Sequence, residues 1–184
     1  MLNSKMVYAD LAPVNLVVCG GAALISLHLI SRSTNDVDVI GSIKSDKDGQ
    51  VCLSPEDALT DELLTLVAEI AIDLGIREDW LNPGPSSLIE FGLPQGLEDR
   101  LIEKMYGFIS RFDQVHLKIF AVMGSESEAT KHLNDLLDLE PTAEETQAAV
   151  DWLLRRESSA DFKLRLKQVL DRIGHERIGE QIQS

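Results

Sequence analysis

The stretch NLVVCGGAALISLHLISRSTNDVDVIG, residues 15–41, decides the fold expected for this chain. Residues 15–19 form a short, mostly apolar and β-branched run, which is typical of a strand buried on both faces. Gly20 and Gly21 end the run, and paired glycines indicate a tight turn. Residues 22–30 carry apolar side chains at helical spacing. The predicted order is therefore strand, glycine turn and helix.

The second half of the stretch predicts another strand. A polar connection, residues 31–35, leads into DVDVIG at residues 36–41. Because side chains alternate between the two faces of a strand, Asp36 and Asp38 should project from the same face. Two carboxylates that close repel each other unless a cation lies between them or one of them takes up a proton. Mg²⁺ prefers oxygen ligands and is the occupant we expect.

The glycine pair has two interpretations. Glycine adopts positive φ angles without strain and lets a backbone N–H approach a ligand closely, so such turns often bind phosphate groups. The alternative is a purely structural turn. The D-x-D strand that follows the helix favours the first interpretation, because phosphate and metal sites occur together in phosphoryl chemistry.

Two motifs carry a resemblance to a known family. The segment GGAAL at residues 20–24 and the segment TNDVDV at residues 34–39 resemble the motifs of the polymerase-beta-like nucleotidyltransferase superfamily. The closest similarity is to the AbiEii-like group, which is linked to toxin–antitoxin and phage-defence systems. This resemblance implies an α/β (α+β) fold, with a small mixed β-sheet flanked by helices. It also implies Mg²⁺-dependent transfer of a nucleotidyl group from a nucleoside triphosphate to a hydroxyl or phosphate acceptor.

The resemblance assigns roles to individual residues. Asp36 and Asp38 would be the catalytic, metal-binding pair. The nucleotide would contact backbone and side-chain groups of Gly20, Gly21, Arg32 and Thr34. Lys118 approximates a lysine that relatives carry in the first C-terminal helix, and it would contact phosphate or a metal-bound carboxylate, or else be an ordinary surface lysine. Residues 131–136 approximate a K-D-L-x-D-L pattern, with His132 in the place of an aspartate.

The chain departs from the family pattern in two places. Ala22 stands where a serine or threonine hydroxyl usually binds a phosphate oxygen. Active members also use a third carboxylate, which the sequence does not assign. The second hypothesis is therefore a catalytically inactive protein of the same fold that acts as a regulatory or antitoxin-like binding partner. The candidates for the third carboxylate are Glu90, Glu98, Asp99, Glu103 and Asp113.

The remaining sequence suggests two parts. We expect a nucleotidyltransferase-like core over residues 1–113 and a C-terminal region of four helices, residues 114–184, packed on that core. Within the core, the connection after Gly41 is predicted to be a loop or an irregular hairpin, and a helix is predicted to open at Ser54. Further strands are predicted over residues 88–93 and 106–112. A turn rich in helix breakers, residues 79–84, should be anchored on the core by Trp80.

Composition limits the partners and the compartment. The formal net charge of −14 argues against a broad surface that neutralises a nucleic-acid backbone. Two cysteines support neither a disulfide scaffold nor a cysteine zinc site. No apolar run reaches the roughly 18–20 residues of a membrane helix, and no secretory signal is recognisable, so we expect a cytoplasmic protein without membrane contact. The acceptor (RNA, a small molecule or a protein) is not specified, and a cognate antitoxin or other partner protein is a further candidate.

Overall fold

The computed structural model describes residues 1–45, 51–54, 59–101, 107–124 and 129–182 of the chain. It divides into two compact units, Met1–Ser110 and Arg111–Ser184. Each unit is described separately below. The division falls where helix α5 (Arg111–Gly124) begins, three residues before the start of the expected helical region.

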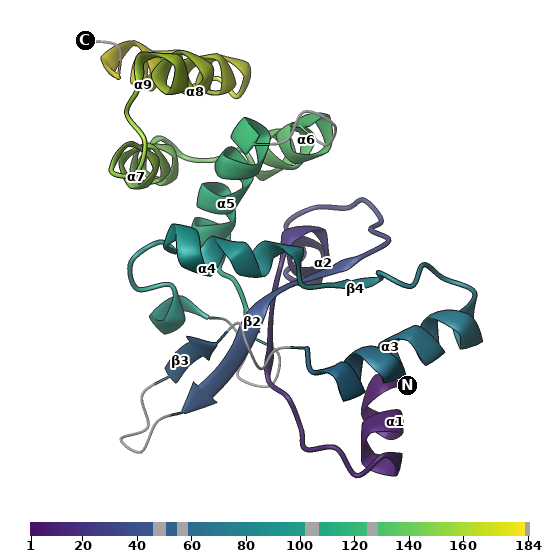
Figure 1. Cartoon of the computed structure of the whole chain (residues 1–184). Helices are drawn as coiled ribbons and strands as arrows, with labels where there is room; N and C mark the ends of the chain where they lie inside the picture. The colour runs from purple at the N-terminus through teal and green to yellow at the C-terminus, as the bar shows by residue number, and fades with distance from the viewer. Residues whose placement is uncertain (46–50, 55–58, 102–106, 125–128, 183–184) are drawn as a thin grey trace. The chain divides into compact units, whose positions relative to one another are not determined.

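The first unit is built on a mixed sheet of five strands flanked by helices, which confirms the predicted fold class (Figure 1). The strand order is β3-β2-β1-β5, and β4 pairs separately with β2. Strand β2 is antiparallel to β1 and β3 but parallel to β4, and β1 is parallel to β5. The strands are β1 (Leu16–Cys19), β2 (Val37–Ser45), β3 (Val51–Ser54), β4 (Leu81–Asn82) and β5 (Gly107–Phe108).

Helices pack on this sheet through small apolar clusters. Val67 of helix α3 packs with Val39 of β2 and Leu81 of β4, and all three are buried. The predicted anchoring role of Trp80 is confirmed, because this side chain packs against the same cluster and its indole N–H donates to the Val67 carbonyl at 3.1 Å. The helices of the first unit are α1 (Leu2–Tyr8), α2 (Gly20–Ser26), α3 (Asp61–Leu74) and α4 (Ser87–Phe91), with 3₁₀ turns at Gly84–Ser86 and Glu98–Arg100.

Several predicted elements of the first unit need correction. The expected strand over residues 88–93 is helix α4, because a short apolar run does not distinguish a buried strand from a short helix. The expected strand over residues 106–112 is reduced to β5, and its end belongs to α5. Ser54 ends β3 instead of opening a helix, and α3 is capped by the hydroxyl of Thr60. The open choice after Gly41 is resolved as a hairpin of β2 and β3.

The second unit is helical throughout its described residues. The part of this unit that the structure describes contains five helices where four were predicted, and the additional one is the short α9. Trp152 of α7 is central to the packing. The centroid of its ring lies 5.8 Å from that of His116 and 6.0 Å from that of Phe120, and both partners belong to α5. The helices are α5, α6 (Ala129–Leu139), α7 (Ala143–Leu154), α8 (Ala160–Arg172) and α9 (Glu176–Gln181).

The turn between α6 and α7 is held by one charged residue. Arg111 donates hydrogen bonds to the carbonyls of Leu139 and Glu140, which α6 leaves without helical partners at its C-terminal end. The same guanidinium pairs with Glu145, with an Nε to Oε1 distance of 2.9 Å. Glu145 also forms a capping box with Thr142. This network joins the beginning of α5 to the beginning of α7.

The network predicts a pH dependence of stability. Burial alone would raise the pKa of the Glu145 carboxyl, but hydrogen bonds from Arg111 and from the Thr142 N–H outweigh burial and hold the pKa below its usual 4.5. A lowered folded-state pKa contributes stability above the unfolded-state value, and that stability is lost as pH falls through the folded-state pKa. Glu145→Gln should therefore cost about 1–2 kcal/mol at pH 7 and flatten the loss of stability below about pH 4.5. Urea unfolding between pH 7 and 3 measures this, with the exposed neighbour Glu144→Gln as the control.

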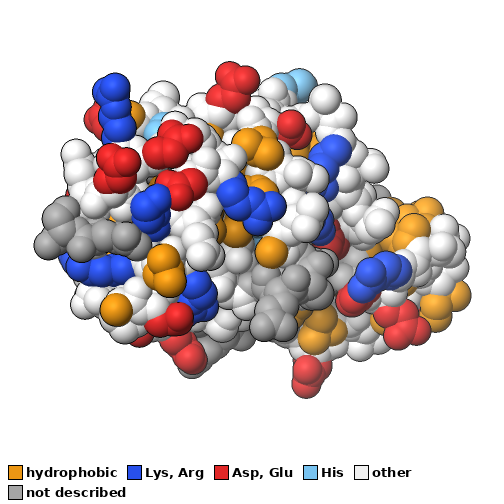
Figure 2. Space-filling model, turned by 90° about the horizontal axis from the view of Figure 1, so that it is seen from above, with side chains coloured by type: hydrophobic (Ala, Val, Ile, Leu, Met, Phe, Trp, Pro, Cys, Tyr) orange, Lys and Arg blue, Asp and Glu red, His pale blue; other side chains and the backbone are white. Residues whose placement is uncertain are grey.

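Two further expectations concerned membrane-spanning helices and a broad basic surface. In the described part of the chain, no helix is both long and apolar enough to cross a membrane. On the face drawn in Figure 2, the described Lys and Arg side chains are interspersed with Asp and Glu side chains and do not gather into one basic patch.

Candidate functional site

The glycine pair directly follows β1, as predicted, but it forms the first turn of α2, which covers Gly20–Ser26 and not residues 22–30. Cys19 is extended, and Gly20 has a φ of +67°, a left-handed conformation that side chains other than glycine rarely adopt. Cys19 lies opposite Asp38 in the antiparallel pairing of β1 with β2. A Cβ atom added to Gly20 would lie 2.1 Å from Oδ2 of Asp38. The absence of a side chain at Gly20 is therefore what lets the Asp38 carboxylate approach the backbone of the turn.

This close approach predicts the effect of Gly20→Ala. The new methyl group would displace the Asp38 carboxylate, and the left-handed backbone would cost a further 1–2 kcal/mol, roughly. Gly174→Ala is the matched control, because Gly174 has a φ of +81° and its added Cβ would meet nothing within 4 Å. Both variants should lose stability in thermal unfolding, and any stabilisation that Mg²⁺ and nucleotide give the wild type should be lost only in Gly20→Ala. Equal responses of the two variants to Mg²⁺ and nucleotide would contradict the role given to Gly20.

Asn82 orients Asp38, and sequence reasoning did not assign this residue to the site. It lies opposite Asp38 in the parallel pairing of β2 with β4. Its Nδ2 donates to Oδ1 of Asp38 at 3.1 Å, and its Oδ1 accepts from the Gly84 N–H at 2.9 Å. The second bond fixes which way the amide faces, so the donor points to Asp38. The predicted turn over residues 79–84 contained this residue, but nothing local in the sequence indicated which strand it would join.

Asp36 lies on the connection immediately before β2 and is half-buried. The hydroxyl of Thr34 donates to Oδ1 of Asp36 at 2.6 Å. Thr34 and Arg32 also lie beside the second glycine, because a Cβ added to Gly21 would be 3.0 Å from Thr34 Oγ1 and 2.9 Å from an Arg32 guanidinium nitrogen. The structure therefore brings together the two glycines, both aspartates, Arg32 and Thr34, six of the seven residues predicted from the sequence.

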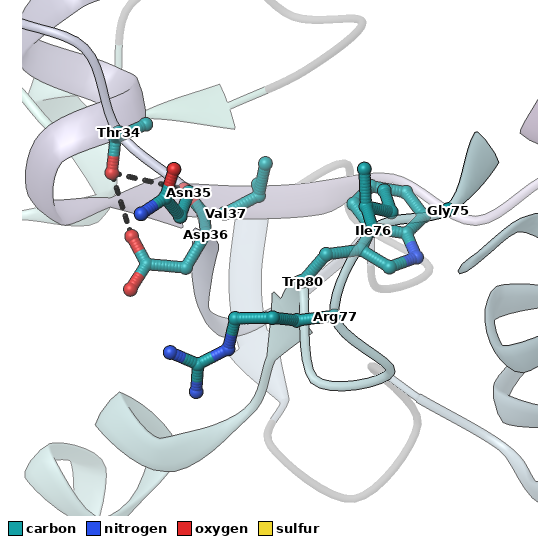
Figure 3. A pocket seen from close by; sticks show the side chains of 8 residues that line it. All are labelled: Thr34, Asn35, Asp36, Val37, Gly75, Ile76, Arg77 and Trp80. Carbon is teal, nitrogen blue, oxygen red and sulfur yellow. Dashed lines mark hydrogen bonds between the residues drawn. The ribbon is translucent and has the colours of Figure 1, made fainter. Parts of the chain in front are cut away.

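A pocket opens beside Asp36. It has a volume of about 510 Å³ and lies between the connection before β2 and the turn that follows α3 (Figure 3). Thr34, Asn35, Asp36 and Val37 line one side, and Gly75, Ile76, Arg77 and Trp80 line the other. Thr34 belongs both to this pocket and to the surroundings of Gly21, so the pocket adjoins the glycine turn.

The two aspartates are suited to an ion that takes its other ligands from a substrate. Mg²⁺ is commonly held by one or two carboxylates, with phosphate oxygens and waters completing its shell. The Asp38 carboxylate has a defined position. Its Oδ2 occupies the space left by the missing side chain of Gly20, and its Oδ1 accepts the hydrogen bond from Asn82. Among the described residues, no group of three or more His, Cys, Asp or Glu side chains could hold a metal. Two carboxylates do not complete the shell of a cation, so a cation at this place would need further ligands from phosphate oxygens or water.

The third carboxylate stays unassigned. Glu90 is exposed on α4, whereas Glu98 and Asp99 lie in the 3₁₀ turn Glu98–Arg100. Asp113 is fully buried in α5 of the second unit, and Glu103 lies outside the described residues. Ala22 lies in the first turn of α2 and carries no hydroxyl.

Lys118 belongs to the second unit. Its Nζ lies 2.6 Å from Oδ2 of Asp135 and 3.5 Å from Nδ1 of His132, and the Lys118 and Asp135 side chains are only 5% and 0% exposed. A buried pair of this kind requires both charges, because either one alone would lack compensation in a region of low dielectric. The ion pair with Asp135 of α6 therefore fixes the position of the Lys118 side chain.

Comparisons with known proteins identified no relative: no family model, no curated protein and no solved structure matches the chain.

Proposed function

We propose that this protein is a Mg²⁺-dependent nucleotidyltransferase that transfers a nucleotidyl group from a nucleoside triphosphate to a hydroxyl or phosphate acceptor. The observation that carries the proposal is the position of the Asp38 carboxylate against Gly20. Its Oδ2 lies only 2.1 Å from the place that a Cβ atom on Gly20 would occupy. This contact joins a carboxylate of the D-x-D strand to a turn whose backbone can approach phosphate closely. Arg32 beside Gly21 adds a positive charge at the same place.

These residues match the needs of the chemistry. Phosphoryl transfer requires positioning and charge neutralisation more than covalent participation by the protein. Gly20 and Gly21 would bind the triphosphate through their backbone, and Arg32 would neutralise part of its charge. Asp36 and Asp38 would hold Mg²⁺, which when bound offsets the negative charge of the phosphates. An acceptor oxygen forms a bond to the α-phosphorus, the bond from the α-phosphorus to the β-phosphate oxygen breaks, pyrophosphate leaves, and a hydroxyl acceptor releases its proton to solvent.

A second candidate function is favoured by the composition of the site. The strand next to Asp38 contributes the amide of Asn82 instead of a carboxylate, and Ala22 supplies no hydroxyl. A catalytically inactive protein of this fold would bind Mg²⁺ and nucleotide weakly or not at all, and would act as a regulatory or antitoxin-like binding partner of another protein. We also propose that the nucleotidyltransferase takes part in a toxin–antitoxin or defence system. The motif resemblance supports this role.

The test is a thermal-shift titration of the full chain with Mg²⁺ and each of the four ribonucleoside triphosphates. A nucleotide at about 100 times its dissociation constant should add about 2.7 kcal/mol to the stability of the folded state. The combined variant Asp36→Asn/Asp38→Asn should lose this Mg²⁺-dependent stabilisation. Absence of stabilisation by all four nucleotides in the wild type would favour the inactive, partner-binding alternative.

A further inference from the structure

We propose that the pocket beside Asp36 binds the nucleoside part of the donor nucleotide. This inference rests on the proposed function, and it assigns to the pocket the part of the substrate that the glycine turn does not contact. The pocket lies between residues 34–37 and the turn that carries Ile76 and Trp80 (Figure 3).

The position of the pocket supports this assignment. The Thr34 hydroxyl lies 3.0 Å from the Cβ position of Gly21, and the same residue lines the pocket. Asp36, which would bind metal, also lines it. A nucleotide whose phosphates lie at Gly20 and Gly21 would therefore have its sugar and base next to this cavity. The volume of about 510 Å³ is within the range of cavities that hold small ligands.

The chemistry of the two walls fits a nucleoside. Val37, Ile76 and Trp80 supply apolar surface for a flat base. The Trp80 indole N–H is bonded to the Val67 carbonyl, which holds the ring in place at the wall of the pocket. On the wall that residues 34–37 form, the Thr34 hydroxyl donates its hydrogen to Asp36 and can accept one from a ribose hydroxyl, and the Asn35 amide can hydrogen-bond to the edge of a base.

The charges of the pocket argue against a phosphate group as its occupant. Arg77 is the one cationic side chain among the eight described residues that line it. Its guanidinium makes two hydrogen bonds to the carboxylate of Asp79, one of them from Nε to Oδ1 at 2.7 Å. The hydrogen bond from Arg77 lowers the pKa of Asp79, so this partner stays ionised. With Asp36 on the other wall, the pocket has no net positive charge, which suits a neutral nucleoside.

The experiment compares two ligands, Mg²⁺-tripolyphosphate and the Mg²⁺-nucleoside triphosphates, on the full chain. Binding is measured by thermal shift and by intrinsic fluorescence, with Trp80→Phe identifying the Trp80 signal. Both kinds of ligand should stabilise the wild type, but only a nucleoside triphosphate should change the emission of Trp80. Ile76→Glu should weaken that nucleotide at least about tenfold and leave tripolyphosphate binding unchanged. Ile72→Glu is the matched control, because Ile72 is 76% exposed at the end of α3 and does not line the pocket.

The outcomes separate this inference from the proposed function. If Ile76→Glu and wild type bind the nucleotide equally, the pocket does not hold the nucleoside and the inference is wrong. If Ile76→Glu still binds the nucleotide but no longer transfers it, the acceptor would occupy the pocket. That result would also overturn the inference. If neither tripolyphosphate nor any nucleotide binds the wild type, the proposed function fails and the inference fails with it.

Discussion

Replacing Asp38 by asparagine is expected to lower nucleotidyl transfer at least about a thousandfold, a loss of about 4 kcal/mol of transition-state stabilisation. Asparagine has almost the same shape, so it still fits beside Gly20, and its carbonyl oxygen can accept the hydrogen bond from Asn82. What it removes is the negative charge that would hold Mg²⁺, whose neutralising effect is worth several kcal/mol in phosphoryl chemistry. The measurement is the initial rate of label incorporation from a nucleoside triphosphate labelled in its α-phosphate, with a cell extract as the source of acceptor.

Asp10→Asn is the matched control for this variant. Asp10 is exposed and has a φ of 54°, which asparagine also adopts, so the same chemical change there should leave both rate and stability unchanged. A folded Asp38→Asn protein with the wild-type rate would refute the assignment of Asp38. Absence of transfer by the wild type itself would favour the inactive alternative.

Replacing Lys118 by methionine is expected to lower the free energy of unfolding of the second unit by about 3–5 kcal/mol. Methionine fills a similar volume, but it leaves the carboxylate of Asp135 without its cation at a position that is 0% exposed. Losing one member of a buried ion pair costs far more than losing an exposed one. Urea unfolding followed by Trp152 fluorescence, in a Trp80→Phe background, reports on the second unit.

Two further variants make this prediction specific. Lys167 and Asp171 are also 2.6 Å apart, but their side chains are 25% and 36% exposed, so Lys167→Met should cost less than about 1 kcal/mol. The double variant Lys118→Met/Asp135→Leu removes both buried charges and should recover most of the loss. A Lys118→Met protein as stable as Lys167→Met would contradict the argument from burial.

The core of the site was predictable because its residues are close in the sequence. Residues 15–41 encode their own order of elements, since the glycines end the first strand and a second short apolar strand follows the polar connection. The expectation that both aspartates project from one strand was wrong for Asp36, because β2 begins at Val37 and only Asp38 lies within it. The contact between Gly20 and Asp38 follows directly from the antiparallel pairing of β1 and β2. Local sequence therefore contained most of the geometry on which the functional proposal depends.

The parts that sequence reasoning missed depend on contacts between distant segments. The apolar residues of α4 were expected to form a strand, because a run of five or six residues has too few turns to show helical periodicity. Asn82 could not be assigned, because its partner is chosen by the parallel pairing of β4 with β2 and not by its neighbours. The pocket likewise combines residues 34–37 with the turn after α3, and no local pattern encodes that combination.

The bond from Asn82 to Asp38 spans 44 residues, and this separation has a consequence during synthesis. Ribosomes add roughly 5–20 residues per second, so the glycine turn emerges several seconds before the strand that orients Asp38. A nascent chain that ends before Asn82 would have both aspartates but no donor to position the second one. Ligand capture by such a chain should be weak, which would delay any activity until translation has passed Gly84.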